Sequence, residues 1–212
     1  MNPVVYWPSR ALAWLYMKVA HRARFEGSGH VPASGPALLV ANHASFLDPP
    51  LLGLASRRPC QFLARSSLGH LRPASWWLGN VGTILIDRDA PSHRVFEVLI
   101  EHLQRGELVT VFPEGTRSRD GRLAPFKRGL QLLVKRTGAP VVPAGIRGTF
   151  AAWPRHRRFP NPLRAVGVRV GAPFAAEEIL AAGGLERLRV RIAELAGIGL
   201  QDRPESEGDG DR

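Results

Sequence analysis

The sequence has 212 residues and a formal net charge of +11 at pH 7, and 44% of its residues are hydrophobic. This length suits one globular domain, and the single cysteine, Cys60, excludes an internal disulfide. We expect no membrane span, since no apolar run approaches roughly 20 residues, and no signal peptide, because Arg10 and Lys18 interrupt the first apolar stretch.

The positive charge is unevenly distributed along the chain. Residues 1–200 carry 27 bases and 13 acids, whereas residues 201–212 carry five acids and two bases. A basic domain attracts polyanions such as nucleic acid, an anionic membrane surface or a phosphorylated small molecule. The other explanation is a genome that uses arginine freely. The polar, acidic segment 201–212 is predicted to be a disordered tail.

The first predicted element is an amphipathic helix over residues 4–24, entered near Pro8. Most of its basic side chains fall within one arc of roughly 120°, at about 100° per residue. These side chains are Arg10, Lys18, His21 and Arg22. A basic face that also carries Trp14 favours a helix in a membrane interface, and a terminal helix packed on the domain is the alternative. We therefore separate an N-terminal segment, residues 1–25, from the domain at residues 26–200.

Apolar runs bounded by turn residues alternate with helical patterns through this domain. The predicted strands cover residues 36–43, 60–65, 81–87, 107–113 and 140–148, with a weaker edge strand at 164–174. The predicted helices cover residues 48–56, 92–106, 126–138 and 176–197, the last broken at Gly183–Gly184. This alternation predicts a single α/β domain with a largely parallel central sheet flanked by helices. Ligands of such sheets bind beyond the carboxyl ends of the strands.

A histidine and an aspartate lie five residues apart in the segment NHASFLDPP, residues 42–50. His43 ends a predicted strand and Asp48 precedes two prolines, so the chain between them must turn and can bring the carboxylate back to the imidazole. Such an aspartate fixes the tautomer and leaves the second ring nitrogen free to take a proton from a hydroxyl. An N-cap role for Asp48 and a histidine satisfied within the turn are the alternatives, and the spacing alone leaves them open.

A candidate anion site lies in the segment FPEGTRSRDG, residues 112–121. Glycine turns expose backbone N–H groups, and Arg117 adds a guanidinium fork, a combination that binds a phosphate dianion. Lys127 and Arg128 lie at the start of the helix predicted at 126–138, where the helix dipole also favours anions. A solvated hairpin and a solvated first helical turn are the alternatives.

Four segments resemble, in this order, the four sequence blocks of the glycerolipid acyltransferases of the lysophosphatidic acid acyltransferase type. They are NHASFLD, GTILIDRD, FPEGTRS and VVPAGIRGT. The resemblance spans about residues 36–150, and the four blocks together are far more specific than any one of them. One departure is Leu85 in the second block, where phenylalanine is common in the family.

The resemblance implies a role for each matched residue. His43 would be the general base and Asp48 its orienting partner, so that a glycerol hydroxyl attacks the acyl thioester without a covalent acyl-enzyme. Acceptor binding is implied for residues of the second and third blocks, with Arg117 as the expected phosphate ligand. These residues are Gly82, Asp87, Arg88, Glu114, Gly115, Thr116 and Arg117. Lys127 and Arg128 complete the predicted site, in which we expect no metal.

The implied reaction transfers a fatty acyl group from acyl-CoA or acyl carrier protein to 1-acyl-glycerol-3-phosphate, giving phosphatidic acid. We expect it at an anionic membrane surface on the cytoplasmic side, with no cofactor. Another lysolipid acceptor, such as a lyso-aminolipid, would keep the same chemistry. The alternatives from other classes are a membrane scaffold without catalysis and a nucleic-acid-binding protein, and since no recognition motif occurs, we expect no nucleic-acid partner.

One basic segment lies outside the matched blocks. WPRHRRFPNPLR, residues 153–164, interleaves aromatic side chains with arginines. Such a segment favours contact with lipid headgroups or with the acidic acyl donor, and a basic surface loop is the alternative.

Overall fold

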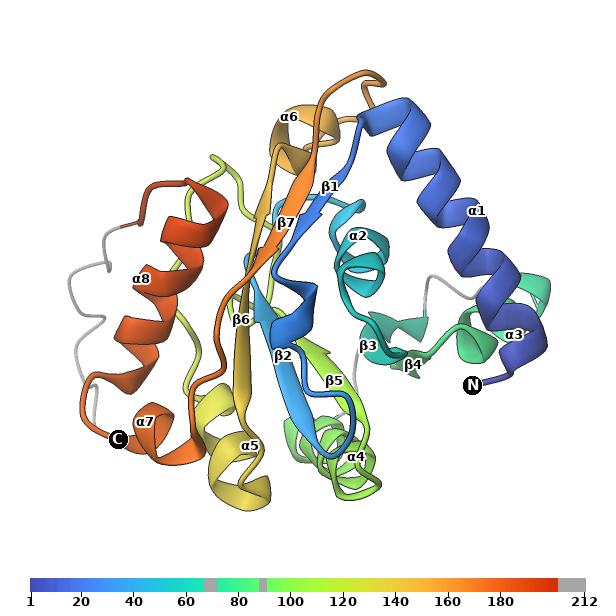
Figure 1. The fold of residues 1–212 in the computed structure, drawn as a ribbon. Coiled ribbons are helices and arrows are strands. Elements are labelled where there is room, and N and C mark those ends of the chain that lie inside the picture. Colours follow the sequence, from blue (N-terminus) through green and yellow to red (C-terminus); the bar gives the residue numbers. More distant parts are fainter. Residues whose placement is uncertain (67–71, 88–90, 202–212) are drawn as a thin grey trace.

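The computed structural model describes residues 1–66, 72–87 and 91–201. Its centre is a seven-stranded sheet in the order β1-β7-β6-β2-β5-β3-β4, in which β1 and β7 run opposite to the other five strands (Figure 1). The strands are β1 Arg24–Glu26, β2 Ala37–Ala41, β3 Cys60–Arg65, β4 Thr83–Ile86, β5 Leu108–Val111, β6 Val141–Arg147 and β7 Gly167–Val170. The predicted α/β fold with a largely parallel sheet is confirmed.

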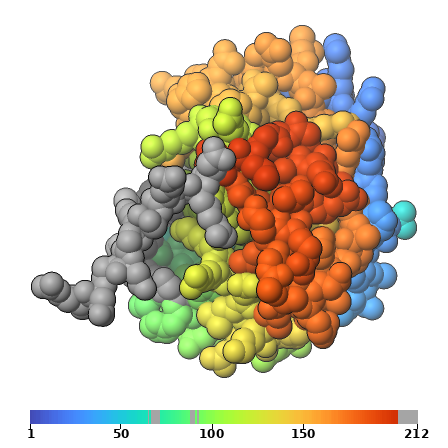
Figure 2. Space-filling model, turned by 90° about the vertical axis from the view of Figure 1, so that its left-hand side faces the viewer, coloured from blue at the N-terminus to red at the C-terminus, as the bar shows by residue number. Residues whose placement is uncertain are grey.

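Helices cover both faces of the sheet. They are α1 Pro3–His21, η1 Ser28–His30, α2 Asp48–Ala55, α3 Arg72–Asn80, α4 Ser92–Gln104, α5 Gly129–Thr137, α6 Thr149–Ala152, α7 Ala176–Leu180 and α8 Gly184–Ala196. α1 and α2 pack on one face, and α4, α5, α7 and α8 pack on the other. Seen from the side of this second face, α7 and α8 cover much of the surface (Figure 2).

The central strand β2 is buried on both of its faces. Leu39 and Ala41 belong to the core cluster shared with α1 and α2, whereas Leu38 and Val40 belong to the cluster shared with α4, α5 and α8. A continuous apolar run is therefore required here, as is typical of a parallel strand between two helical layers. The same run places the carboxyl end of β2 in the middle of the sheet.

Two elements at the edges of the sheet, β1 and α3, were not predicted from the sequence. The segment predicted as an edge strand at 164–174 contains β7, which lies inside the sheet because β1 pairs with its outer side. β1 has only three residues, too few for a periodic pattern. Glu26 in β1 accepts hydrogen bonds from Arg147 at 3.2 Å and Arg169 at 2.8 Å. α3 was missed as well, and it packs beside β4.

α1 is oriented opposite to the interpretation in which its basic face meets a membrane. It begins at Pro3 rather than near Pro8, because the Asn2 side chain accepts the Val4 N–H at 3.0 Å and caps it. His21, expected on an outward basic face, is fully buried and contacts the Arg164 carbonyl oxygen at 3.2 Å. The large side chains that α1 exposes are apolar. They are Val4, Trp7, Leu12, Trp14, Leu15, Tyr16 and Val19.

Arg10 also points toward the domain rather than away from it. Its guanidinium donates to the carbonyl oxygens of Gly53 at 2.5 Å, Leu54 at 3.2 Å and Ser56 at 2.8 Å. These carbonyls belong to the last turn of α2 and the residue after it, where orphan acceptors and the helix dipole favour a cation. A basic residue of α1 therefore caps α2 instead of meeting a membrane.

We expect Arg10→Met to lower the free energy of unfolding by about 2–3 kcal/mol, since it leaves three carbonyls without their charged donor. Urea unfolding of the full chain measures this change. Arg94→Met on the exposed surface of α4 is the matched control, and equal stability of the two variants would show that the cap contributes nothing.

Candidate active site

His43 lies just beyond the carboxyl end of β2, where the chain leaves the sheet. The preceding Asn42 holds this exit, because its side chain donates to the Ile146 carbonyl oxygen at 2.9 Å and accepts the Ile146 N–H at 2.7 Å. The Asn42 side-chain amide thus takes the place of the backbone hydrogen bonds that β2 would make with β6 if β2 were one residue longer. His43 is thereby fixed at the edge where sheets of this kind bind ligands.

His43 and Asp48 form a direct pair. His43 Nδ1 lies 2.9 Å from Asp48 Oδ2, and the same oxygen accepts the N–H groups of Ala44 at 2.6 Å and Ser45 at 2.7 Å. The Asp48 side chain is fully buried, while 19% of the His43 side chain is exposed. When Nδ1 donates to the carboxylate, Nε2 carries the lone pair, and no described residue hydrogen-bonds to it. This is the arrangement that a general base requires.

The alternative interpretation held that Asp48 caps α2, and the structure does not show such a cap. α2 begins at Asp48 itself, and Leu47 occupies the N-cap position without a side-chain hydrogen bond. The carboxylate binds N–H groups that precede it in the chain rather than those of the following helical turn. The N-cap prediction is therefore wrong, and the turn between His43 and Asp48 is closed by the carboxylate.

The His43 imidazole is contacted on its ring face as well as at Nδ1. The rings of His43 and Phe112 stack with centroids 4.2 Å apart and planes 19° apart. Phe112 directly follows β5, the neighbour of β2 in the sheet. The stack and the Asp48 contact together restrict rotation of the ring.

The loop after β5 is attached to His43 at two points. Glu114 Oε1 accepts the His43 backbone N–H at 2.7 Å, and the Ser118 N–H donates to the His43 carbonyl oxygen at 2.7 Å. The second oxygen of Glu114 accepts the Ala124 N–H at 3.1 Å. Both oxygens of this predicted acceptor ligand thus bind backbone, so Glu114 acts as a positioning residue for His43 and the 114–118 loop.

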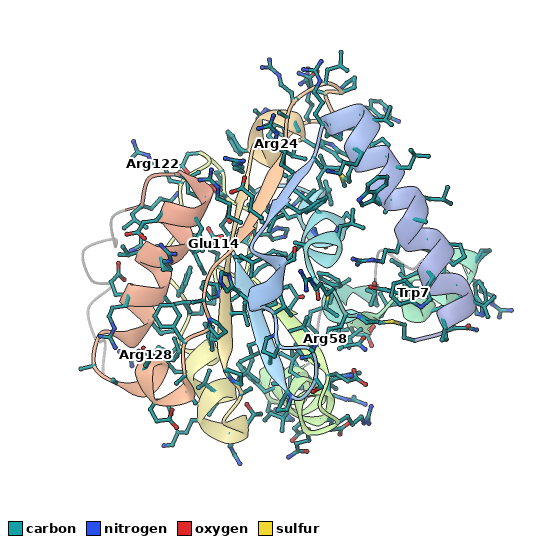
Figure 3. The ribbon with its side chains drawn as sticks, viewed as in Figure 1. Trp7, Arg24, Arg58, Glu114, Arg122 and Arg128 are labelled. Carbon is teal, nitrogen blue, oxygen red and sulfur yellow. The ribbon has the colours of Figure 1, made fainter. Side chains whose placement is uncertain are left out.

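Glu114 is 4% exposed. Figure 3 labels it near the centre of the molecule. Burial raises the pKa of its carboxyl to about 7, which the N–H groups of Ala124 and His43 offset in part, and the nearby Asp48 charge adds to the rise. The protonation state of this carboxyl therefore changes near neutral pH, next to the base.

The 114–118 loop brings cations to the same edge. The Arg117 guanidinium lies 3.6 Å from the centroid of the Phe46 ring, and Phe46 belongs to the turn between His43 and Asp48. Gly115 has φ +71°, a left-handed conformation that favours glycine, and a Cβ there would fall 2.8 Å from Lys127 Nζ, so the lysine side chain lies directly against this turn. The predicted residues Arg117 and Lys127 thus flank one exposed turn that includes Thr116.

The other predicted acceptor residues lie farther from His43. In the register of the strands, Asp87 is level with His43 but three strands away, about 14 Å at the usual spacing. Gly82 precedes β4 at the opposite, amino edge, where a Cβ would fall 2.9 Å from the Cys60 carbonyl oxygen, a packing constraint. Arg128 is exposed on the outer flank before α5 (Figure 3). Arg88 lies outside the described residues.

Several residues of the site were not predicted. Asn42, Phe112 and Ser118 are parts of the matched blocks, but their contacts depend on the pairing of strands far apart in sequence. Trp153, whose ring centroid lies 5.3 Å from that of Phe46, follows β6 and α6. For Trp153 the sequence did give an indication, because this residue begins the basic segment at 153–164.

Comparison with known proteins decides the family. A family model described as acyltransferase matches residues 22–147. The chain belongs to the acyltransferase family. The match includes His43, Asp48 and the loop that binds the His43 backbone.

Individual relatives agree with this assignment. A chloroplastic 1-acyl-sn-glycerol-3-phosphate acyltransferase of Brassica napus is 34% identical over 137 residues, 63% of this chain and 40% of the relative. The mouse 1-acyl-sn-glycerol-3-phosphate acyltransferase alpha is 34% identical over 178 residues, 78% of this chain and 60% of the relative. A lyso-ornithine lipid O-acyltransferase of Pseudomonas aeruginosa is 33% identical over 140 residues, 65% of this chain and 53% of the relative.

A solved structure shares the fold. The 1-acyl-sn-glycerophosphate acyltransferase PlsC of Thermotoga maritima superimposes with a TM-score of 0.70 at 29% identity, covering 92% of this chain and 76% of that chain. The matched part of this acyltransferase spans 40% to 60% of the length of the Brassica and mouse relatives.

The raised pKa of Glu114 predicts a stability that depends on pH. An unfolded glutamate releases its proton near pH 4.5, whereas the folded one keeps it to about pH 7. Raising the pH from about 4.5 to 7 should therefore lower the free energy of unfolding, by on the order of 2–3 kcal/mol. The contribution becomes constant only at pH values well above 7, where the folded carboxyl is fully ionised.

Glu114→Gln tests this sign, because glutamine does not titrate. Urea unfolding at several pH values should show the wild type losing stability relative to the variant between pH 4.5 and 7. A difference between the two proteins that stays constant over this range would contradict the raised pKa.

Proposed function

We propose that this acyltransferase transfers a fatty acyl group from an acyl thioester to the free hydroxyl of 1-acyl-glycerol-3-phosphate and so forms phosphatidic acid. The observation that carries the proposal is the His43–Asp48 pair, in which Nδ1 contacts the buried carboxylate and the imidazole is 19% exposed. The named relatives that acylate 1-acyl-sn-glycerol-3-phosphate support the choice of acceptor.

The proposed reaction proceeds by direct attack. His43 Nε2 takes the proton of the acceptor hydroxyl as its oxygen attacks the thioester carbonyl carbon, and the buried carboxylate of Asp48 stabilises the imidazolium. Collapse of the tetrahedral intermediate breaks the carbon–sulfur bond, and the proton passes from His43 to the leaving thiolate. The products are an ester and a free thiol, so the chemistry needs no metal or redox cofactor.

The acceptor phosphate fits the cationic turn beside the base. Arg117 and Lys127 supply the charge, and Gly115 allows a phosphate to approach the backbone. The 114–118 loop is fixed to the His43 backbone at both ends, so the distance between the phosphate site and the base is fixed as well. Acyl-CoA and acyl carrier protein both present a thioester, and either fits this mechanism.

A second acceptor has a specific observation in its favour. The lyso-ornithine lipid O-acyltransferase of Pseudomonas aeruginosa is nearly as similar, at 33% identity. Such a lysolipid offers a hydroxyl without a phosphate. It would use the same base, and Arg117 would then contribute little to its binding.

An acyl-transfer assay with both lysolipids and both donors tests the proposal. We expect His43→Ala to lower kcat by at least about 1,000-fold, since the reaction loses its base, and Asp48→Asn to lower it by about 100-fold or more. Arg117→Gln should raise KM for lysophosphatidic acid and leave the lyso-ornithine reaction unchanged. Equal turnover by the wild type and His43→Ala would rule out the proposed mechanism.

The proposed site of action is an anionic membrane surface, to which the protein binds peripherally. Among the described helices, none is long and apolar enough to span a bilayer. α1 instead exposes an apolar face, with Leu12 69% and Val19 68% exposed, and Trp76 and Trp77 of the adjacent α3 are exposed too. An exposed face of this kind with aromatic side chains suits the boundary between headgroups and acyl chains.

Vesicle sedimentation tests this attachment. The triple change Leu12→Gln, Leu15→Gln and Val19→Gln should abolish most vesicle binding without loss of stability, because these side chains are exposed. The matched control replaces exposed apolar residues elsewhere, Leu132, Leu180 and Val190, by glutamine. Loss of binding in both triple variants alike would argue against α1 as the attachment site.

A further inference from the structure

The segment between α6 and β7, residues 153–165, forms an exposed loop that we call the arginine loop. It lies at the end of the molecule beyond the carboxyl end of β6, the orange region at the top of both views (Figures 1 and 2). Its four arginines are all exposed. They are Arg155, Arg157, Arg158 and Arg164. No acidic residue occurs between Asp120 and Glu177 in the sequence, so this loop has no acid of its own to neutralise it.

The arginine loop also exposes large apolar side chains. Phe159 is 67% exposed and Leu163 is 65% exposed. Leu163 has φ +67°, a left-handed conformation that disfavours residues with a branched side chain. An exposed leucine in this conformation stabilises neither a core nor the local backbone.

Hydrogen bonds join the arginine loop to the end of α1. The Leu163 N–H donates to the Ala20 carbonyl oxygen at 2.6 Å, the Val166 N–H donates to the His21 carbonyl oxygen at 3.1 Å, and the His21 ring contacts the Arg164 carbonyl oxygen. The exposed Leu163 of the loop therefore lies beside the last turn of α1, whose exposed large side chains are apolar. One surface carries hydrocarbon along the helix and arginines at its end.

The other end of the arginine loop touches the catalytic turn. Pro154 pairs with Ser45 in an isolated antiparallel bridge, and Trp153 contacts Phe46 with ring centroids 5.3 Å apart. The Trp153 indole N–H donates to the Arg157 carbonyl oxygen at 2.9 Å. The loop thus forms one wall beside the His43–Asp48 turn.

We propose that the arginine loop binds the phosphate headgroups of an anionic bilayer and so holds the entrance of the active site against the membrane. The inference rests on the proposed function, because in that reaction a lipid acceptor would reach His43 from the bilayer that the arginine loop binds. Guanidinium groups remain at the level of lipid phosphates while Phe159 and Leu163 enter the acyl boundary.

A bilayer explains more of the loop than an acidic protein partner does. An acidic protein partner would need only the exposed arginines of the loop in order to bind. It would not require exposed leucine and phenylalanine side chains on the same loop, nor the position of Leu163 beside the last turn of α1. A bilayer requires both, because its surface is anionic and its interior apolar.

Sedimentation of the full chain with phosphatidylcholine vesicles, with and without about one third phosphatidylglycerol, tests the proposal. The variant is Arg155→Gln, Arg157→Gln and Arg158→Gln. We expect affinity for the anionic vesicles to fall roughly fivefold for each arginine removed, and the loss to shrink as salt rises. Binding to the neutral vesicles should stay unchanged.

A matched control removes the same charge elsewhere. Arg94→Gln, Lys135→Gln and Arg136→Gln neutralise exposed cations of α4 and α5, at the opposite end of the molecule. This control should weaken anionic binding by less than about twofold, because its cations lie more than a Debye length from the bilayer. Equal losses in the two variants would show that only net charge matters and would overturn the proposal.

Leu163→Gly supplies a second variant that does not endanger the fold. Glycine accepts the left-handed backbone, so the thermal midpoint should stay the same or rise. Binding to both kinds of vesicle should fall several-fold, because the variant loses a side chain that enters the acyl boundary. Unchanged binding would contradict this contact.

The outcomes of these experiments distinguish a failure of the inference from a failure of the proposed function. The vesicle measurements need no turnover, so arginine-dependent binding by a protein that acylates no acceptor would support the lipid surface and reject the proposed reaction. Conversely, unaltered vesicle binding combined with a raised KM for acyl carrier protein in a vesicle-free assay would reject the lipid surface and assign the arginine loop to an acidic protein.

Discussion

Three N–H groups converge on one carboxylate oxygen of Asp48, and the arrangement of the active site follows from that convergence. The donors are the His43 ring and the backbones of Ala44 and Ser45, and no water reaches the fully buried acceptor. A buried carboxylate without such donors would be strongly disfavoured. The same interaction therefore closes the turn and orients the His43 imidazole.

A second carboxylate supports His43 from the backbone side. Glu114 binds the His43 N–H and the Ala124 N–H, and Ser118 binds the His43 carbonyl oxygen. His43 is thus fixed by the ends of two neighbouring strands, β2 and β5, as well as by its own short turn. Catalytic groups supported by rigid elements keep their geometry better than groups on free loops.

Much of this arrangement could be predicted from the sequence. The apolar run ending at His43 and the turn residues from Pro113 to Gly121 indicated strand ends, and parallel strands bring their ends to one edge of the sheet. The contacts of Asn42, Glu114 and Phe112 could not be predicted, because they depend on register between distant strands. The orientation of α1 was left open by the sequence, since periodicity shows that a helix has two faces but not which one packs. Arg10 and His21 have buried acceptors on α2 and near Arg164, and these partners turn the basic face inward.

Arg10 and Asp48 lie at opposite ends of the same short helix. α2 begins with the carboxylate that orients His43 and ends at the carbonyls that bind the guanidinium of α1. With eight residues, α2 acts as a rigid strut of about 12 Å between α1 and the His43–Asp48 pair. Removing α1 would therefore release one end of that strut as well as the apolar face. A truncated chain that lost activity would report on the alignment of the His43–Asp48 pair as much as on the loss of the apolar face.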